Sequence, residues 1–418
     1  MVAERDKLVK RGHIPAISPS RRSARRVVPC QHAATARNAP LDTHANTLYC
    51  QGLRPFRRDA VTTLRRRTMT QTKVRCIDGD GHVIEDPRKI LEHMEAPYRS
   101  WYVGRGGNVS LLPSDGAPRG LGGKFRGGAG NSTESWLKMM QEGDLASAIL
   151  YPTSGLFAGC LKDPDYAVAY CRAYNDWLAK ELLKPGQGLC GVALLSIQDP
   201  EEAAKQLRHA KQQPGLVGAM LPADGGHLLG HRRYDPIYRA AAETGIPLGI
   251  HASGSWAADA HTTAHQFPKF IQAHTMSHPV GILRQFTSMM FEGVFERFPS
   301  VRFAFLECGG SWVPWWLDRM DEEYEHRGEE EAPDLKHKPS TFVRQGGNIF
   351  FGCEAEERLL GPTLDVIGSD TVMYASDWPH WDGDYPNSLF EIQQRQDLTE
   401  EQRQGVLCRA AERFYGLG

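Results

Sequence analysis

The chain of 418 residues has no apolar run near the length of about 18 residues that a membrane-spanning helix needs. Its nine cysteines are scattered, and none of them form the CxxC pairs of a zinc module. No apolar secretory signal is present, and no GxGxxG motif follows the first predicted strand. These absences argue against a membrane protein, a disulfide framework and a dinucleotide-binding fold. We therefore expect reduced thiols and a cytoplasmic location.

The net charge of -1 conceals two unlike parts of the chain. Residues 1–68 hold 13 Arg and 2 Lys against 4 acidic residues, and the remainder has a net charge of -12. We predict a basic, disordered leader over residues 1–68 and one domain over residues 69–418. The leader could instead be a targeting segment, an arm for nucleic acid, or sequence upstream of a natural start at Met69. The acidic domain itself opposes nucleic-acid binding.

From Lys73 onward, short apolar runs alternate with helical patterns, which is typical of a parallel sheet wound with helices. Eight runs are predicted as strands, at residues 73–82, 147–153, 189–196, 216–223, 246–253, 301–310, 348–354 and 371–379. Helices that open on Asp-Pro are predicted at 163–183, 199–213 and 235–245. This order predicts an α/β fold, a (β/α)8 TIM barrel, rather than an open doubly wound sheet.

A Gly-rich stretch at residues 98–143 follows the first predicted strand and interrupts the alternation. We interpret it as an insertion in the barrel. Loops of this length at the catalytic face often cover an active site, and a flexible spacer is the alternative.

Ionisable residues stand at the ends of several predicted strands, where barrel enzymes carry their catalytic groups. They are Asp78, Asp80, His82, His251, Glu307, Asp377 and His380. Because the carboxyl ends of the strands meet at one mouth, we expect side chains from distant parts of the chain to converge there. Buried carboxylates are costly unless a cation or a partner compensates their charge.

Four of these residues form a predicted site for one divalent cation. Asp80 and His82 are two residues apart on an extended segment, so their side chains share a face, with Gly81 between them. His251 adds an imidazole and Asp377 a carboxylate, which leaves positions for water or substrate. The structural alternatives are a loop histidine and an aspartate that caps a helix. We predict that Asp80, His82, His251 and Asp377 bind the metal.

Four motifs resemble those of a known family: "IDGDGHVIED", "PLGIHAS", "FERFPSVRFAFLECGGSWVPWWLDRMDEEYE" and "YASDWPHWDGDYPNS". Their order and spacing are similar to those of the amidohydrolase-related, metal-dependent TIM barrels (amidohydrolase family 2). The branch is that of aminocarboxymuconate semialdehyde decarboxylase and the aromatic acid decarboxylases. The resemblance extends from Val74 to the C-terminus and implies one divalent metal on the four residues named above. It departs at Glu307, because the decarboxylases often carry a histidine there.

The resemblance implies a metal-dependent lyase that decarboxylates a small carboxylated substrate, aromatic or unsaturated, without oxidation. Asp377, His278 and Glu307 are the catalytic candidates for delivering a proton to the carbon that loses carbon dioxide. The alternative is a hydrolase that uses metal-activated water, with Asp377 as the base. A catalytically inactive barrel is the remote alternative. We expect Zn²⁺, with Mn²⁺ as the other metal that such mixed ligands suit.

Two further stretches bear on the site and on assembly. His278 precedes a proline that is predicted to open the helix before the sixth strand, whereas His261, His265 and His274 are expected to face solvent. The aromatic run at 312–317 is predicted to pack in the core near a helix start. Some of the relatives use this region between subunits, so we also expect a homodimer.

Overall fold

The structure, a computed structural model, describes residues 75–101, 103–105, 108–112, 129–253, 264–345 and 347–417. The predicted basic leader over 1–68 lies outside the described residues, as does the Gly-rich centre of the insertion at 113–128. The domain boundary at residue 69 therefore stays a prediction.

Eight parallel strands form one sheet in the described part of the chain, in the order β1-β4-β5-β6-β7-β8-β9-β10. Their bounds are β1 Cys76–Val83, β4 Leu145–Pro152, β5 Leu189–Leu194, β6 Leu216–Pro222, β7 Leu248–His251, β8 Phe303–Leu306, β9 Ile349–Cys353 and β10 Val372–Tyr374. Each overlaps one of the eight predicted strands. Because the runs are apolar and lie between helical segments, they form a buried parallel sheet.

Two backbone hydrogen bonds join the first strand to the segment after the last one. The N–H of His82 donates to the carbonyl of Trp378 at 2.7 Å, and the N–H of Asp377 donates to the carbonyl of Asp80 at 3.1 Å. They close the sheet into a barrel at the ends of the strands that carry the predicted ligands. The (β/α)8 prediction is confirmed.

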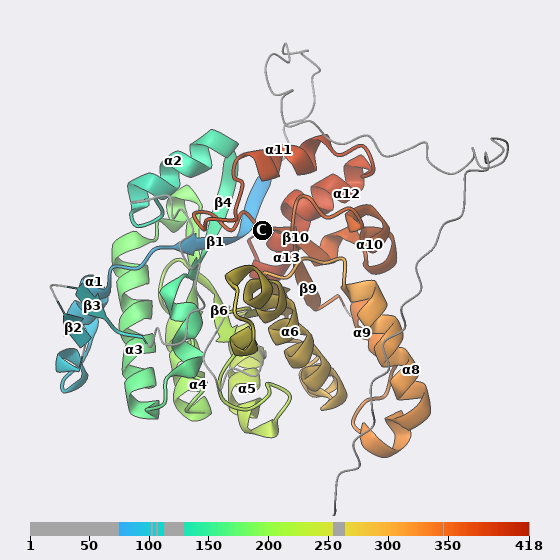
Figure 1. Cartoon of the computed structure of the whole chain (residues 1–418), viewed down its shortest axis with the longest axis horizontal. Coiled ribbons are helices and arrows are strands. Elements are labelled where there is room, and N and C mark those ends of the chain that lie inside the picture. Colours follow the sequence, from blue (N-terminus) through green and yellow to red (C-terminus); the bar gives the residue numbers. More distant parts are fainter. Residues whose placement is uncertain are drawn as a thin grey trace, which may run out of the picture. The chain divides into compact units, whose positions relative to one another are not determined.

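Helices follow the strands and surround the barrel (Figure 1). The α-helices are α1 Pro87–His93, α2 Thr133–Gly143, α3 Pro164–Trp177, α4 Pro200–Ala210, α5 Asp235–Thr244, α6 Phe270–Phe291, α7 Val294–Arg297, α8 Val313–Glu331, α9 Pro339–Arg344, α10 Leu360–Ile367, α11 Asn387–Gln394, α12 Glu400–Gln404 and α13 Ala410–Tyr415. No helix in the described ranges combines the length and the apolar character that crossing a membrane requires.

The Asp-Pro signal located two helix starts correctly and the third with an error of one residue. The side chains of Asp163 and Asp199 accept backbone N–H groups of the first turns of α3 and α4. In α5 the helix begins at Asp235 itself, Tyr234 holds the cap position, and no side chain caps the helix. The predicted capping role of Asp235 is therefore wrong.

The predicted insertion contains regular structure as well as loop. It includes the antiparallel pair β2 Val103–Arg105 and β3 Asn108–Ser110, and it ends in helix α2. Trp136 of α2 is fully buried, and its ring contacts that of Trp378 with centroids 4.7 Å apart. A Cβ built on Gly81 would lie 2.4 Å from the Trp136 ring, so this glycine allows α2 to pack against β1 beside the predicted ligands.

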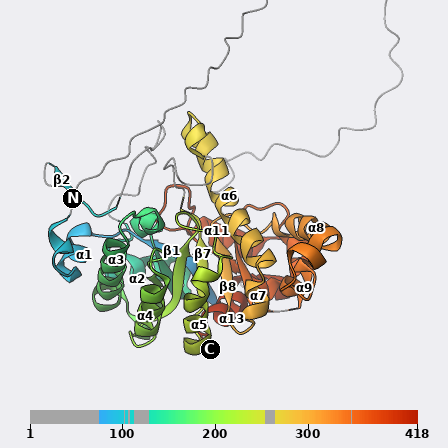
Figure 2. The ribbon, with the colours of Figure 1, turned by 90° about the horizontal axis from the view of Figure 1, so that it is seen from below.

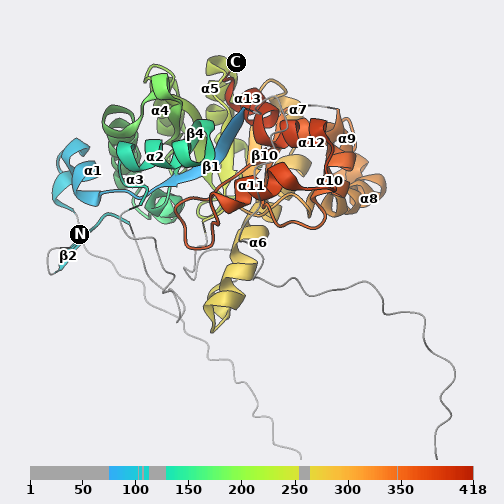
Figure 3. The ribbon, with the colours of Figure 1, turned by 90° about the horizontal axis from the view of Figure 1, so that it is seen from above.

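Helix α6 corrects the prediction that His278 and its proline open a helix. The helix starts at Phe270, and Pro279 lies inside it. The residues before the proline continue the helix, so the proline is accommodated in the interior rather than at the first turn. Figures 2 and 3 show the first turns of α6, in yellow, projecting beyond the body of the barrel.

The aromatic run at the start of α8 packs only in part. Val313 and Leu317 are fully buried, as the core prediction requires. Trp315 is 62% exposed, which the prediction did not foresee. Consecutive residues of a helix point in different directions, so only some residues of the aromatic run can face the core.

Candidate metal centre

The predicted ligands of β1 and β7 come together at the mouth of the barrel. Asp80, His82 and His251 are all buried. The Nε2 atom of His251 lies 3.3 Å from Oδ1 of Asp80, and Nε2 of His82 lies 3.7 Å from the same oxygen. On its other side, Nε2 of His82 lies 3.4 Å from Oδ1 of Asp377. Asp80 thus lies beside both imidazoles, and Asp377 lies on the other side of His82.

Both imidazoles are oriented by backbone carbonyl groups. The Nδ1 atom of His82 lies 2.8 Å from the carbonyl oxygen of Pro152, and Nδ1 of His251 lies 2.7 Å from that of Ala252. A carbonyl oxygen can only accept a hydrogen bond, so each Nδ1 carries the proton and donates. Each Nε2 then presents its lone pair to the carboxylates, which is the tautomer that a metal ligand needs.

The distances and the lack of hydrogen-bond partners fit a divalent cation. Ligand atoms at about 2.0–2.2 Å from one ion stand about 3–4 Å from one another, and the distances above fall in this interval. Among the described residues, Nε2 of His82 is buried without a hydrogen-bond partner. Such an orphaned atom is costly unless a cation satisfies it.

Glu307, at the end of β8, lies within the same mouth. Its Oε2 atom is 3.3 Å from Nδ1 of His251 and 3.5 Å from Nε2 of His278. Oε2 is also buried without a hydrogen-bond partner among the described residues. Glu307 thus lies beside the predicted ligand His251, and His278 lies beside Glu307.

His380 is a site residue to which the sequence assigned no role. Its Nδ1 atom lies 2.6 Å from Oδ1 of Asp377, and its Nε2 atom lies 3.0 Å from the hydroxyl of Thr153. Its ring stacks on that of His82, with centroids 4.0 Å apart. The signal was its position three residues after a predicted ligand. Only the turn after β10 shows that the side chain folds back over the site.

Burial dominates the titration of the site. It raises the pKa of Glu307 well above its usual value, and the charges of Asp377 and Asp80 raise it further. Burial also raises the pKa of Asp377, against the opposing effect of His380. Carboxylates crowded in this way require a compensating positive charge to remain ionised together.

Burial lowers the pKa of two histidines of the site, whereas it raises that of the carboxyl groups. Burial lowers the pKa of His82 well below its ordinary value, and it lowers the pKa of His278 to about 3. These two imidazoles are therefore neutral near neutral pH. Neutral imidazole is the form that binds a metal or accepts a proton.

Two of the carboxylates sit on strained backbone. Glu307 and Asp377 have φ angles of 59° and 50°, in the left-handed region that residues other than glycine rarely adopt. Such a conformation costs about 1–2 kcal/mol per residue, and residues of this kind cluster at functional sites. The two residues end β8 and follow β10, so the strain occurs at the mouth.

Asp78 and His274 do not behave as the sequence pattern suggested. Asp78, the first of the two acidic residues of β1, accepts hydrogen bonds from the backbone N–H of Ser376 at 3.0 Å and from its hydroxyl at 2.6 Å. It therefore joins β1 to the segment after β10.

His274 was expected to face solvent, but its side chain is only 27% exposed, and Nε2 lies 3.6 Å from Oδ2 of Asp382. His261 and the side chain of His265 lie outside the described residues.

Comparison with known proteins identifies the family of this fold and site. The family model described as Amidohydrolase matches residues 148–417, which is more than half of the chain. The chain belongs to the amidohydrolase family. This confirms the family prediction made from the four motifs.

The relatives of this amidohydrolase include decarboxylases. The gamma-resorcylate decarboxylase of Rhodococcus jostii (strain RHA1) is 24% identical over 253 residues, which cover 58% of this chain and 76% of the relative. The 2-amino-3-carboxymuconate-6-semialdehyde decarboxylase of Dictyostelium discoideum is 23% identical over 256 residues, which cover 61% of this chain and 68% of the relative. Both are of the class expected from the sequence.

A solved structure of similar fold contains a metal. The dihydroxybenzoic acid decarboxylase of Polaromonas sp. JS666, with bound manganese and the inhibitor 2-nitroresorcinol, has a TM-score of 0.64 and 17% identity. The match covers 82% of this chain and 98% of that one. A divalent metal in this fold is thus supported, whereas the expected preference for zinc stays a prediction.

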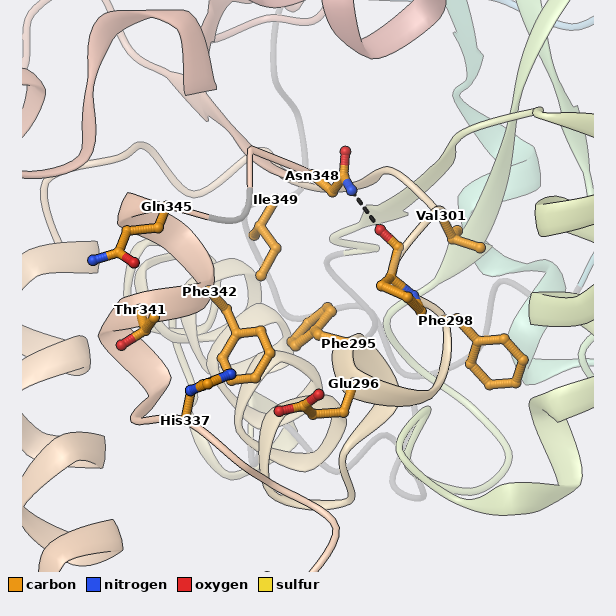
Figure 4. A pocket seen from close by; sticks show the side chains of 11 residues that line it. Phe295, Glu296, Phe298, Val301, His337, Thr341, Phe342, Gln345, Asn348 and Ile349 are labelled. Atoms are coloured by element: carbon orange, nitrogen blue, oxygen red, sulfur yellow. Dashed lines mark hydrogen bonds between the residues drawn. The ribbon is translucent and has the colours of Figure 1, made fainter.

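A cavity of about 260 Å³ lies away from this site (Figure 4). It is lined by Phe295, Phe342 and Ile349 among others, and by Val301 and Asn348, which precede β8 and β9. It therefore opens at the amino ends of the strands. In TIM barrels that end serves stability rather than catalysis, so we do not assign this cavity to the reaction.

Proposed function

We propose that this amidohydrolase is a metal-dependent decarboxylase of a small carboxylated substrate, aromatic or unsaturated. The observation that carries the proposal is the position of His82 between Asp80 and Asp377, with its Nε2 buried and without a hydrogen-bond partner among the described residues. His251 lies on the other side of Asp80. The decarboxylase relatives support the same class of reaction.

The four predicted ligands would hold one divalent cation. When bound, the cation supplies Lewis-acid stabilisation of an oxygen of the substrate. The carbonyl groups of Pro152 and Ala252 keep the two imidazoles in the orientation that this binding requires.

The reaction breaks the bond between the substrate carbon and its carboxylate, releases carbon dioxide and leaves the electron pair on the carbon. A proton must replace the carboxylate there. Asp377 and Glu307 are placed to supply it, because burial raises the pKa of each and lets it hold a proton. Neutral His278 lies beside Glu307, with Nε2 3.5 Å from Oε2, where the two groups can exchange a proton.

Hydrolysis is the second candidate function, and Glu307 is the observation that favours it. A carboxylate beside the predicted cation can accept a proton from an attacking water as well as donate one. The decarboxylases often have a histidine at this position. The chain therefore differs from them at a side chain that lies beside the predicted metal ligands.

Incubation of metal-loaded enzyme with a panel of hydroxybenzoates and unsaturated dicarboxylates, in deuterated water, tests the proposal. Decarboxylation releases carbon dioxide and leaves one deuterium on the carbon that lost it. Hydrolysis instead introduces oxygen from labelled water without release of carbon dioxide. Neither product from any member of the panel, with the metal bound, would contradict the proposed activity.

Elemental analysis of the purified protein tests the ligands independently. We expect His251→Ala and Asp377→Ala to lose both the metal and the activity, because each removes one donor from the site. A matched control is His337→Gln, at the amino end of the barrel, which should retain both. Full metal occupancy in both alanine variants would overturn the site assignment.

Zinc, a homodimer and a cytoplasmic location complete the proposal. Mixed imidazole and carboxylate ligands suit zinc as well as the manganese of the Polaromonas structure. Exposed Trp315 and Ile271, 62% and 72% accessible, offer apolar contact area for a second copy. The scattered cysteines, without CxxC pairs, fit a reducing compartment.

A further inference from the structure

Two buried tyrosines join helix α13 to the strands around the predicted metal centre. Tyr415 ends α13, which packs against β1 and β10 (Figure 1), and Tyr151 belongs to β4. Their hydroxyl groups lie 2.9 Å apart, and the Tyr415 hydroxyl donates to the carbonyl of Gly79 at 2.6 Å. A hydroxyl has a single proton, and that of Tyr415 is engaged by Gly79. Tyr151 is therefore the donor between the two tyrosines.

We propose that Tyr415 is a positioning residue of the metal centre. It acts on Asp80 through the carbonyl of Gly79, and on His251 through the ring of Tyr151. The inference rests on the proposed function, because it uses the same predicted ligands. It goes beyond that function in giving a hydroxyl of α13, which is not itself a ligand, control over the affinity for the cation.

Gly79 lies where β1 departs from a regular strand. The pairing of β1 with β4 shifts its register between Asp78 and Gly81, with one extra residue on β1. A bulge of this kind disrupts the ladder of hydrogen bonds and redirects the neighbouring side chains. The Tyr415 hydroxyl binds the carbonyl of Gly79 inside this segment. It therefore holds the backbone immediately before Asp80, whose carboxylate faces the imidazoles of the site.

The Tyr151 ring carries the second effect of Tyr415. Its centroid lies 5.1 Å from that of the His251 ring and 6.4 Å from that of the His82 ring. A Cβ built on Gly249 would lie 2.4 Å from the Tyr151 hydroxyl, so this end of the ring is closely enclosed. The hydrogen bond to Tyr415 fixes the same end. The ring thus limits how far the two neighbouring imidazoles can turn.

The hydroxyl of Tyr415 separates positioning from core packing. A phenylalanine ring would fill the same space, as Phe414 does where it packs on Phe350 with ring centroids 5.2 Å apart. A buried hydroxyl is costly unless it is hydrogen-bonded, and both partners of this one adjoin predicted ligands. Removal of the oxygen alone therefore tests the inference while the ring stays in place.

The affinity for Mn²⁺ tests the inference without reference to activity. Protein freed of metal with a chelator is titrated with Mn²⁺, and electron paramagnetic resonance measures the free ion. Tyr415→Phe should raise the dissociation constant about tenfold, as expected when a group that orients metal ligands is removed. Tyr151→Phe keeps the bond between Tyr415 and Gly79 and should raise it less. The double variant should bind as weakly as Tyr415→Phe, because both changes act through the same hydroxyl.

The matched control is Tyr238→Phe. Tyr238 is fully buried in α5, and its hydroxyl donates to the carbonyl of Leu229 at 2.6 Å. Its ring packs on those of Phe298 and Phe303 rather than on an imidazole. This variant should leave the dissociation constant unchanged, although it too loses a buried hydrogen bond. With Co²⁺ in place of Mn²⁺, the absorption bands report ligand geometry and should shift in Tyr415→Phe but not in the control.

Each result of these titrations decides for or against the inference. A Tyr415→Phe variant that binds Mn²⁺ as tightly as the wild type overturns it and leaves the proposed function standing. An equal loss of affinity in Tyr238→Phe also overturns it, because a general loss of packing then explains both. If circular dichroism shows that Tyr415→Phe is not folded, an unchanged dissociation constant in Tyr151→Phe overturns the inference. A wild type that binds no Mn²⁺ overturns the proposed function together with the inference.

Discussion

Replacing Asp78 by Asn should reduce the loss of folding stability that the protein undergoes as the pH rises. Asp78 is fully buried, and burial is the main cause that raises its pKa from 3.8 to about 7. Its Oδ2 atom lies 2.6 Å from the hydroxyl of Ser376, and Oδ1 accepts the N–H groups of Ser376 and Asp80. A protonated carboxyl can donate to that hydroxyl, and the amide of Asn donates in the same place.

The sign and size follow from the difference in proton binding between the folded and unfolded states. In the unfolded chain the carboxyl ionises near its ordinary pKa of 3.8, whereas in the folded chain it does so near 7. The stability that Asp78 contributes is therefore complete below pH 3.8 and is lost as the pH rises through 7. At about 1.4 kcal/mol per pH unit, the loss between about pH 5 and pH 8 is about 3 kcal/mol.

Urea unfolding of chelator-treated wild type and Asp78→Asn at several pH values measures this loss. Removal of metal keeps the surroundings of Asp78 the same in both proteins. The contributions of all other titrating groups cancel when the unfolding free energy of the wild type is subtracted from that of the variant. The free energy of unfolding of the variant minus that of the wild type should rise by about 3 kcal/mol over about pH 5 to 8. Ser376→Ala, which retains the carboxyl but removes its hydroxyl partner, should keep the pH dependence. A difference that does not change with pH would refute the neutral, buried carboxyl.

Two further substitutions test the packing that supports the site. Gly81→Ala places a Cβ 2.4 Å from the Trp136 ring, so the free energy of unfolding should fall by about 1–3 kcal/mol and metal binding should weaken. Thermal unfolding and metal titration measure the two effects, and unchanged values would contradict the close contact. Glu357 accepts hydrogen bonds from the N–H groups of Gly310 and Ser311, at 2.9 and 2.6 Å. Glu357→Gln leaves one acceptor oxygen and should lower the free energy of unfolding, measured in urea, by about 1–3 kcal/mol. No loss would contradict the role of this carboxylate in holding the segment before α8.

The strands and the ligands were predictable because both depend on local signals. An apolar run bounded by helical patterns predicts a buried parallel strand, and an ionisable residue at its end predicts the functional face of a barrel. His251 illustrates this, because it ends the apolar run of β7 and lies at the mouth. No knowledge of the neighbouring strands is needed for that inference.

Asp78 and Asp80 show where the local signal fails. In a regular strand, residues two apart point to the same face, so both would be expected at the mouth. The pairing of β1 with β4 shifts its register between Asp78 and Gly81, as at a bulge. A shift of this kind redirects side chains, so Asp78 contacts Ser376 while Asp80 faces His251. The sequence gives no sign of this shift, because it depends on how two distant strands pair.

Glu307 and Asp377 connect the conformation of the site to its chemistry. A glycine would adopt their positive φ angles of 59° and 50° without strain, but it would bring no carboxylate. The chain thus retains a costly backbone conformation at the two positions where acidic side chains meet His380, with distances to Nδ1 of 3.8 and 2.6 Å. Glu307 is also where the chain departs from the histidine that decarboxylases often carry. In the proposed reaction, Glu307 is therefore the group at which this chain differs from those relatives in how a proton is supplied.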